Sequence, residues 1–306
     1  MYSRRAFGKA ALAGVAWPCA ARTQSVYGGV HVGAAAYGYP GLPLTPGAAD
    51  TLDAWIQVFR DIGYVEMELA NNILEPPQPN LRGPGQQERR QKAREEIRQW
   101  RLSTPGSHFT EVRRKLDRSG IRPTVYTCNG MGDDFTEAEI DTQFKQAREL
   151  GVTVLASSTQ VSVAEKLIPF AERHKMRVAF HNHSDVTHPN EFATPASFEK
   201  AWEMSKYYLT NLDVGHFTAA NLDPVSFIEA HHARISHIHI KDRKKEQGPN
   251  RPWGEGDTPI KEALQLIKKN RYPIPCYQEF EYRIPEGSSS AAEWKRCREF
   301  LINGLA

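Results

Sequence analysis

The sequence predicts an α/β protein, a (β/α)8 TIM barrel in a single domain. Eight short apolar segments with strand character alternate with helical segments over about 275 residues, the length of such a barrel. Strands that alternate with helices form parallel βαβ units. A doubly wound sheet is the alternative, but the turn after the first strand, Ala-Tyr-Gly-Tyr-Pro-Gly at 36–41, lacks GxGxxG spacing. No internal repeat or domain linker is visible.

The strand and helix units follow one another with a single interruption. The first strand is expected at 30–36 and its helix at 49–62, where apolar residues recur at helical spacing. The second strand, 64–69, is followed by an insertion at about 71–104, which is Pro-rich and then highly charged. We interpret it as a loop and an exposed helix. The remaining strands are expected at 121–127, 152–156, 176–181, 208–213, 234–240 and 274–280, and the remaining helices at 106–119, 136–150, 161–174, 195–205, 224–231, 259–270 and 290–303.

Composition and charge exclude several classes of protein. The chain of 306 residues is 40% hydrophobic and 25% charged, and no apolar run reaches the length of about 18 residues that a membrane-spanning helix needs. The net charge of +3 comes entirely from Arg4, Arg5 and Lys9; without them, basic and acidic residues are equal at 36 each. A neutral chain offers no electrostatic case for a nucleic-acid partner or an acidic lipid surface. The four cysteines are far apart and form no CxxC pair, so no disulfide framework is expected.

The N-terminus has the pattern of a targeting segment. Ser3-Arg4-Arg5-Ala6-Phe7-Gly8-Lys9 is followed by a short run of small apolar residues, 10–16, and then by Trp17-Pro18-Cys19-Ala20-Ala21. This order resembles the bacterial twin-arginine export signal. We therefore expect residues 1–29 to be a signal peptide with a short linker, and residues 30–306 to be the barrel. The resemblance implies a periplasmic or secreted protein without a stable membrane anchor.

Four consecutive predicted strands, the fifth to the eighth, end in residue types that bind metals. In a TIM barrel the catalytic groups lie at the C-terminal ends of the strands. Neighbouring strands are about 4.8 Å apart, so residues at their ends can converge on one ion. The four segments are Phe180-His181-Asn182-His183-Ser184-Asp185, Leu212-Asp213-Val214-Gly215-His216-Phe217, His237-Ile238-His239-Ile240-Lys241-Asp242 and Gln278-Glu279-Phe280-Glu281-Tyr282.

Each of these motifs alone has a simpler interpretation, as a hydrogen-bonded structural histidine, a polar strand face or a solvated glutamate. Residues two apart on a strand share one face, so three pairs have a common direction. Two glutamates are rarely placed in one buried strand without partners. The joint occurrence at four neighbouring strand ends favours a metal site. The pairs are His181 with His183, His237 with His239, and Glu279 with Glu281.

The same motifs resemble those of the sugar phosphate isomerase/epimerase family, in the xylose isomerase-like TIM barrel superfamily. The resemblance covers nearly all of residues 30–303. It is carried by His239-Ile240-Lys241-Asp242, Leu212-Asp213-Val214-Gly215-His216 and Glu279-Phe280-Glu281, with Gly63-Tyr64-Val65-Glu66-Met67-Glu68-Leu69, Arg234-Ile235 and Gly254-Glu255-Gly256-Asp257 as supporting marks.

The resemblance implies one divalent metal, with His181, Asp213, His239 and Glu279 as its ligands. The best-understood sugar epimerases of the superfamily have a glutamate where this chain has His181, and they use two metal-bound glutamates as the two bases. Epimerisation here then requires a histidine in the second role. Whether His181 or His183 is the ligand stays open, because both have the same parity. Two imidazoles and two carboxylates suit Mn, Zn, Fe or Co better than Mg or Ca.

Further roles follow from the resemblance and from position. Glu279 is a ligand and a candidate base, and His183 and His216 are expected to contact substrate or support the metal ligands. Lys241 is a candidate to stabilise an enolate oxygen, unless it pairs with Asp242. Glu281 either orients the metal cluster or pairs with a cation such as Arg243. Trp253 either stacks on a sugar ring or anchors its own loop. Glu68, at the second strand, faces the pocket in the family pattern, and Tyr37 is a weaker pocket candidate.

The expected function is a metal-dependent isomerase or epimerase that acts on a free or modified carbohydrate through an enediolate. The alternatives are a lyase or hydrolase that eliminates the aglycone of a 3-keto-glycoside, and a sugar-binding module without catalysis. A superfamily endonuclease is disfavoured by the neutral chain. The partner is a small carbohydrate. The charged stretch 84–101 is either a surface for homo-oligomer assembly or a solvated face.

Overall fold

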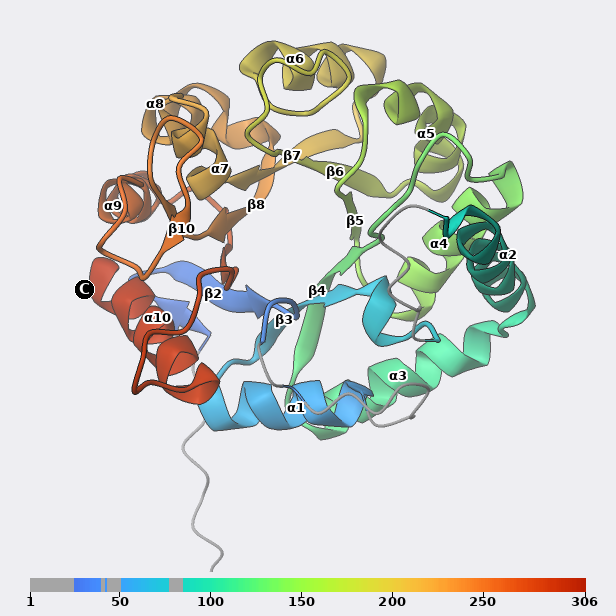
Figure 1. Ribbon diagram of the computed structural model, residues 1–306, viewed down its shortest axis with the longest axis horizontal. Coiled ribbons are helices and arrows are strands. Elements are labelled where there is room, and N and C mark those ends of the chain that lie inside the picture. Colours follow the sequence, from blue (N-terminus) through green and yellow to red (C-terminus); the bar gives the residue numbers. More distant parts are fainter. Residues whose placement is uncertain (1–24, 40–41, 43–50, 77–84) are drawn as a thin grey trace, which may run out of the picture.

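The computed structural model describes residues 25–39, 42, 51–76 and 85–306, and they form the predicted barrel. Eight parallel strands close on themselves, with β2 paired to both β11 and β3 (Figure 1). The α/β class and the (β/α)8 TIM barrel in a single domain are therefore confirmed. The barrel strands are β2 (Val30–Ala35), β3 (Glu66–Ala70), β4 (Arg122–Thr127), β5 (Val154–Ser157), β6 (Arg177–His181), β7 (Tyr208–Asp213), β8 (Ile235–Ile240) and β11 (Cys276–Gln278).

The helices surround the barrel and pack on it from outside (Figure 1). The eight helices predicted with bounds, which correspond to α1, α3–α6 and α8–α10, begin and end within two residues of the predicted positions, because amphipathic periodicity and capping residues define them locally. For example, Thr136 and Glu139 form a reciprocal capping box at the start of α4. The helices are α1 (Thr51–Ile62), α2 (Gln87–Ser103), α3 (Gly106–Arg118), α4 (Glu137–Glu149), α5 (Val161–His174), α6 (Pro195–Met204), α7 (Val214–Ala219), α8 (Pro224–His231), α9 (Ile260–Asn270) and α10 (Ser290–Gly304), with short 3-10 turns η1 (Asn71–Ile73) and η2 (His232–Arg234).

Three details differ from the sequence-based expectation. The helix α7 begins directly after β7, because Asp213 ends the strand and caps the helix through a 2.7 Å hydrogen bond from the His216 backbone N–H. A small hairpin, β9 (Asp242–Arg243) with β10 (Asn250–Arg251), follows β8. A short strand, β1 (Val26–Tyr27), pairs antiparallel with β2, so ordered structure begins before residue 30. The twin-arginine motif lies outside the described residues.

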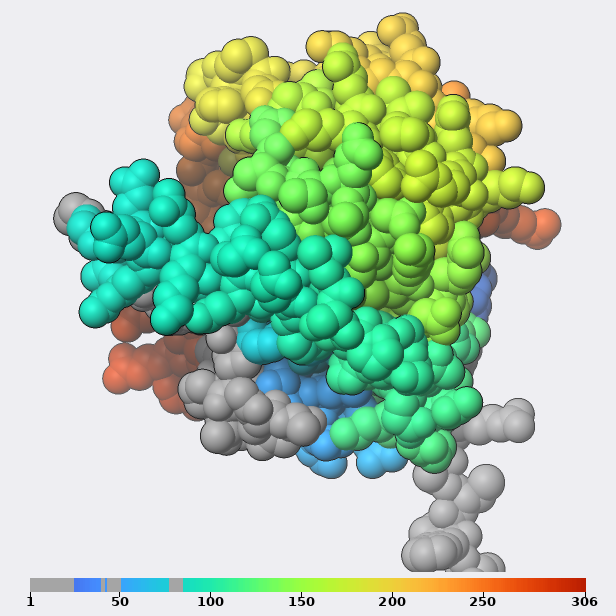
Figure 2. All heavy atoms as spheres, turned by 90° about the vertical axis from the view of Figure 1, so that its right-hand side faces the viewer, coloured from blue at the N-terminus to red at the C-terminus, as the bar shows by residue number. Residues whose placement is uncertain are grey.

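The insertion after β3 carries a helix, as expected, but one face of this helix is anchored. Figure 2 shows α2, in teal, projecting from the side of the molecule. On its inner face Ala93, Ile97 and Arg101 are buried. The Arg101 guanidinium binds the Glu75 carboxylate with two bonds, Nε to Oε1 at 2.7 Å and Nη2 to Oε2 at 2.9 Å. This bidentate pair fixes the helix to the segment that follows β3.

The core has two parts. A large apolar layer lies between the strands and the helices, and a small one fills the inside of the barrel. The inner layer is made of Val125, Val154, Ala156, Ala179, Leu209 and Tyr277. Beyond it, toward the C-terminal ends of the strands, the interior becomes polar, and there the predicted site residues lie. Within the described residues, no helix has both the length and the apolar character needed to cross a membrane.

Candidate metal centre and substrate pocket

Four side chains from neighbouring strand ends meet in the barrel. His181 ends β6, Asp213 ends β7, His239 lies in β8, and Glu279 directly follows β11. The parallel register pairs Asp213 with His239, which brings the strand ends to the same level. One ligand atom from each of the four residues lies within 4.8 Å of the others. All four side chains are buried, with residue exposures of 7%, 0%, 4% and 7% in chain order.

The four residues fit a metal ion because their converging atoms lack hydrogen bonds of acceptable geometry, and the two carboxylate oxygens among them already attract the cationic Lys241. Buried polar atoms are almost always hydrogen-bonded, and leaving one unpaired costs about 1–3 kcal/mol. No hydrogen-bond partner of acceptable geometry, within the described part of the chain, serves the atoms that converge here. They are His181 Nδ1, Asp213 Oδ2, His239 Nδ1 and Glu279 Oε2. Two imidazole nitrogens and two carboxylate oxygens form a donor set suited to a first-row transition metal.

The ammonium group of Lys241 stands beside this cluster. Its Nζ lies 2.9 Å from Asp213 Oδ2 and 2.8 Å from Glu279 Oε2. It donates a hydrogen bond to Glu281 Oε2 at 2.5 Å and lies 2.9 Å from His216 Nε2. The residue is 2% exposed, so its charge is compensated almost entirely by these carboxylates. A cation is therefore part of the electrostatic balance of the site.

The pKa shifts leave His181 and Glu279 ready to bind a cation, whereas the raised pKa values of Asp213 and His239 mean that these two residues release a proton when a cation binds. Burial, together with the positive side chain of His239, holds the pKa of His181 well below its ordinary value, so the imidazole is in the neutral form that binds metals. Burial and the Glu279 carboxylate raise the pKa of Asp213 to about 8, against the opposing charge of Lys241. Burial also acts to raise the pKa of Glu279, but Lys241 and His239 outweigh it and hold that pKa well below the usual range. Glu279 is thus ionised.

Glu68 supports the site from below. Its Oε2 lies 2.6 Å from His239 Nε2 and 3.2 Å from His237 Nε2, deep in the barrel. Burial acts to raise the pKa of Glu68, but the two histidines lower it well below its ordinary value. A carboxylate at Nε2 of His239 holds a proton on that nitrogen, and Nδ1, on the other side of the ring, lies 3.4 Å from Glu279 Oε2. The Glu68 side chain also lines the pocket floor, so substrate contact and support of His239 are both compatible with its position.

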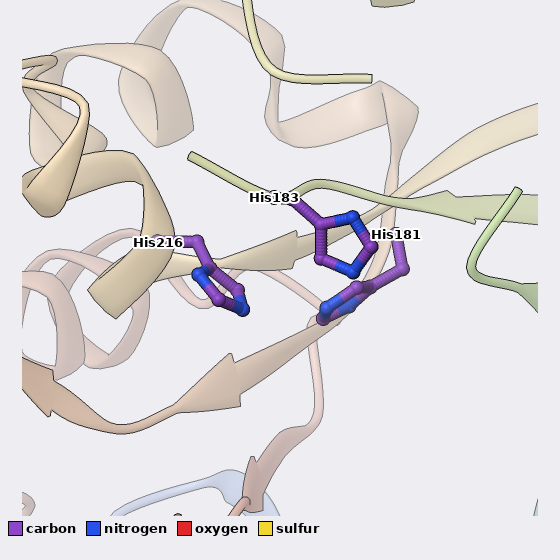
Figure 3. A group of neighbouring side chains, drawn as sticks. All are labelled: His181, His183 and His216. Atoms are coloured by element: carbon purple, nitrogen blue, oxygen red, sulfur yellow. The ribbon is translucent and has the colours of Figure 1, made fainter. Parts of the chain in front are cut away.

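Two further histidines lie beside His181, and Figure 3 shows the three rings gathered together. His183 contacts the Glu191 carboxylate through Nδ1 and Ser158 Oγ through Nε2, the latter at 3.1 Å. His216 accepts a hydrogen bond at Nδ1 from Arg243 Nη1 at 2.6 Å. Lys241 Nζ lies 2.9 Å from Nε2, so both ring nitrogens of His216 face cationic donors. His181 belongs to both the three-histidine and the four-residue group, whereas His183 belongs only to the former.

A cavity of about 320 Å³ opens over these groups. Of the predicted site residues, eight line it directly, and Asp213 and Lys241 are buried behind its wall. The sequence reasoning missed the polar residues Asn72, Asn129, Ser158 and Asn211. Of these, only Asn211 carried a signal, since it is two residues before Asp213 on the same strand. The predicted residues in the lining are Tyr37, Glu68, His181, His183, His216, His239, Glu279 and Glu281.

Trp253 and Asp242 lie elsewhere, and both serve the loop after β8. Trp253 is 2% exposed and packs edge-on against Phe300 at 6.1 Å, outside the cavity lining. The Asp242 carboxylate accepts backbone N–H bonds from Gly254 and Gly256 at 2.8 and 2.9 Å. Trp253 therefore has the position expected for a loop anchor rather than for stacking on a sugar. Lys241 pairs with the pocket carboxylates rather than with Asp242.

The comparisons with known proteins agree with this architecture. Residues 86–303 match the family described as xylose isomerase-like TIM barrel, and the chain belongs to that family. Among curated proteins, none matches the sequence.

Several solved structures share the fold at low identity. A xylose isomerase domain protein from Alicyclobacillus acidocaldarius has 15% identity and a TM-score of 0.63, over 90% of this chain and 98% of that one. D-psicose 3-epimerase from Clostridium cellulolyticum has 12% identity and a TM-score of 0.61, over 90% and 99%. The 3-keto-D-glucoside 4-epimerase from E. coli has 11% identity and a TM-score of 0.60, over 88% and 98%.

Proposed function

We propose that the protein is a metal-dependent sugar isomerase or epimerase that acts on a free or modified carbohydrate. The observation that carries this proposal is the convergence of four buried ligand atoms, none with a hydrogen bond of acceptable geometry among the described residues, at the floor of an open cavity. His181, Asp213, His239 and Glu279 are the proposed ligands of one divalent ion, Mn, Zn, Fe or Co. Such an ion, when bound, polarises a carbonyl and acidifies the adjacent C–H.

The residues of the chain supply the proton transfers. Glu279, ionised and 7% exposed, is the proposed base on one side of the sugar. His183, oriented by Glu191 at the cavity wall, is the proposed acid or base on the other side. His216, which lines the cavity, is placed to hydrogen-bond a sugar oxygen, whereas Lys241, buried behind the cavity wall, acts through the carboxylates of Asp213, Glu279 and Glu281. Return of the proton to the neighbouring carbon gives isomerisation through an enediolate, and return on the opposite face gives epimerisation.

Elimination from a 3-keto-glycoside is the second candidate function. It needs the same acidified C–H but only one carboxylate base and an acid for the leaving group. The observation that favours elimination is His181, which occupies the position where the sugar epimerases that this sequence resembles have a second glutamate. The similarity to a 3-keto-D-glucoside 4-epimerase supports an oxidised glycoside as a substrate class for either reaction.

We also propose that the protein is exported. The twin-arginine pattern in residues 1–29 supports a periplasmic or secreted location, with the barrel beginning near residue 30. Sugar phosphates are cytoplasmic, so export supports a carbohydrate without a phosphate as the substrate. A homo-oligomer built through the charged stretch 84–101 is a further proposal, which the mass in solution tests.

Metal content, measured by elemental mass spectrometry, tests the proposed site. We expect one equivalent of a transition metal in the purified protein and its loss in His239→Ala and Glu279→Ala. His188→Ala and Glu286→Ala, which change exposed residues of the same types, are matched controls and should keep the metal. A protein without metal, or site variants that retain it, would refute the proposed mechanism. Solvent deuterium entering the sugar supports isomerisation or epimerisation, whereas release of the aglycone from a 3-keto-glycoside indicates elimination.

A further inference from the structure

A second cavity adjoins the candidate pocket. Its volume is about 570 Å³, larger than the 320 Å³ of the pocket above the metal ligands. The two cavities share four lining residues, so one ligand can extend through both. The shared residues are Ala36, Tyr37, Asn72 and Glu281. The Glu281 carboxylate at this junction is held by Lys241, whose Nζ is 2.5 Å from Oε2.

The second cavity, which we call the annex, has a wall of aromatic rings. Tyr39, Trp55, Phe280 and Tyr282 line it. The rings support one another: Phe280 lies 4.3 Å from Tyr282 between ring centroids, and the buried Trp294 lies 5.5 Å from Tyr39 and 5.9 Å from Trp55. Rings in such contact keep fixed orientations, and their faces and edges favour another ring at a similar distance. The annex is thus a preformed apolar surface.

The backbone is arranged to keep the annex wall close to the barrel. Gly38 has a φ of +67°, and a Cβ at this position would lie 1.9 Å from the Phe280 carbonyl oxygen. Only glycine permits this approach without displacement of the chain. The segment after β2, which carries Tyr37 and Tyr39, therefore lies directly against the segment after β11, which carries Phe280 and Glu281.

The two cavities differ in chemistry. Histidines, asparagines and carboxylates line the pocket and suit a ligand rich in hydroxyl groups, whereas the annex presents mainly aromatic and aliphatic groups. Phe280, Tyr282 and Trp55 are only 1–5% exposed, so the ring surface that a ligand can cover belongs mainly to the half-buried Tyr39 and to Tyr37, which is 43% exposed. We propose that the substrate is a keto-glycoside with an apolar, ring-containing aglycone, which occupies the annex while its oxidised sugar, whose carbonyl acidifies the adjacent C–H, occupies the pocket. This inference rests on the proposed function and names its substrate class.

Binding of two glucosides with identical sugars tests the inference. Phenyl β-D-glucoside and methyl β-D-glucoside differ only in the aglycone, and calorimetric titration of the metal-loaded protein measures both. We expect the phenyl compound to bind about 10- to 100-fold more tightly, the gain from burying one ring. Tyr39→Ala should reduce this preference to a few-fold without changing the affinity for the methyl compound. Tyr207→Ala, which removes a half-buried ring far from the annex in sequence, is the matched control.

A second variant keeps the inference testable if Tyr39→Ala does not fold. Asn72→Trp changes an exposed residue at the junction and should hinder only the phenyl compound. Equal affinity for the two glucosides, binding of neither, or a phenyl preference that survives both variants would overturn the role of the annex. The metal analysis above is independent of the aglycone, so a protein that loses metal in Glu279→Ala but shows no phenyl preference keeps the proposed function and loses only this inference.

Discussion

Substitution of Lys241 by methionine tests the electrostatics of the site most directly. Methionine keeps most of the length of the side chain and removes the charge that Asp213, Glu279 and Glu281 surround at 2.5–2.9 Å. Removing one partner from a buried ion pair costs about 3–5 kcal/mol, because the remaining charges are buried without compensation. In a chain of this size 1 kcal/mol shifts Tm by about 2–4 °C. We therefore expect Tm of the metal-free variant to fall by roughly 6–20 °C.

A bound divalent ion changes this expectation. It offsets the charges of Asp213 and Glu279, and at 100 times its Kd it adds about 2.7 kcal/mol to the free energy of unfolding. The loss caused by Lys241→Met should therefore be smaller in Mn²⁺ than in EDTA. Scanning calorimetry in both solutions measures the difference, with the exposed Lys269→Met as the control. An equal loss of stability in the two solutions would show that Lys241 and the metal do not share these carboxylates, and the reasoning would fail.

Three other predictions concern stability. Glu75→Gln breaks the bidentate pair with Arg101, whose side chain is 8% exposed. We expect the free energy of unfolding, measured in urea, to fall by about 3 kcal/mol. A change below about 1 kcal/mol would mean that this pair does not anchor α2. Gly38→Ala forces a Cβ into the Phe280 carbonyl at positive φ and should lower the free energy of unfolding by about 1–3 kcal/mol. Gly29→Ala, also at positive φ but in open space, should lower it less. Equal losses of stability in the two variants would contradict the close approach at Gly38. The pKa of Asp141 is lowered to about 2, because Lys145 and His174 outweigh the opposing effect of burial. A depressed carboxyl pKa adds stability above the unfolded value near 4, and this contribution is lost as the pH falls through the folded value. After allowance for solvent screening, Asp141→Asn should lower the free energy of unfolding by about 1 kcal/mol at pH 7 and by nothing near pH 2. Urea unfolding across that pH range measures the difference. A loss of stability that does not depend on pH would assign the effect to packing.

The order of the elements could be predicted from the sequence because their signals are local. Amphipathic spacing and caps marked helices such as 161–174 and 224–231 at their observed bounds. The alternation of strands and helices then restricts the topology to a few parallel folds. The C-terminal strand ends of a barrel lie at one face. The sequence alone therefore predicted that His181, Asp213, His239 and Glu279 are close to one another. Their ligand role itself remains a prediction for the metal analysis.

Contacts between distant segments could not be read from the sequence, since a side chain's partners depend on the closed barrel. Parity could not distinguish His181 from His183, and only the fold shows that His183 turns to Glu191 and Ser158. The choice of Lys241 between Asp242 and the pocket carboxylates also depends on the path of the chain after β8. The same holds for Trp253, which the fold buries against Phe300.

The sequence by itself determined the fold class, the eight strand–helix units and the strand ends where polar chemistry gathers. Those properties follow from periodicity and residue type, which act over a few residues. Only the tertiary structure decided that Glu68 supports His239 across the barrel and that an aromatic annex opens beside the pocket. The physical reason is that hydrogen bonding of buried groups and packing of rings depend on distances of a few ångströms between segments far apart in the chain, and folding alone sets those distances.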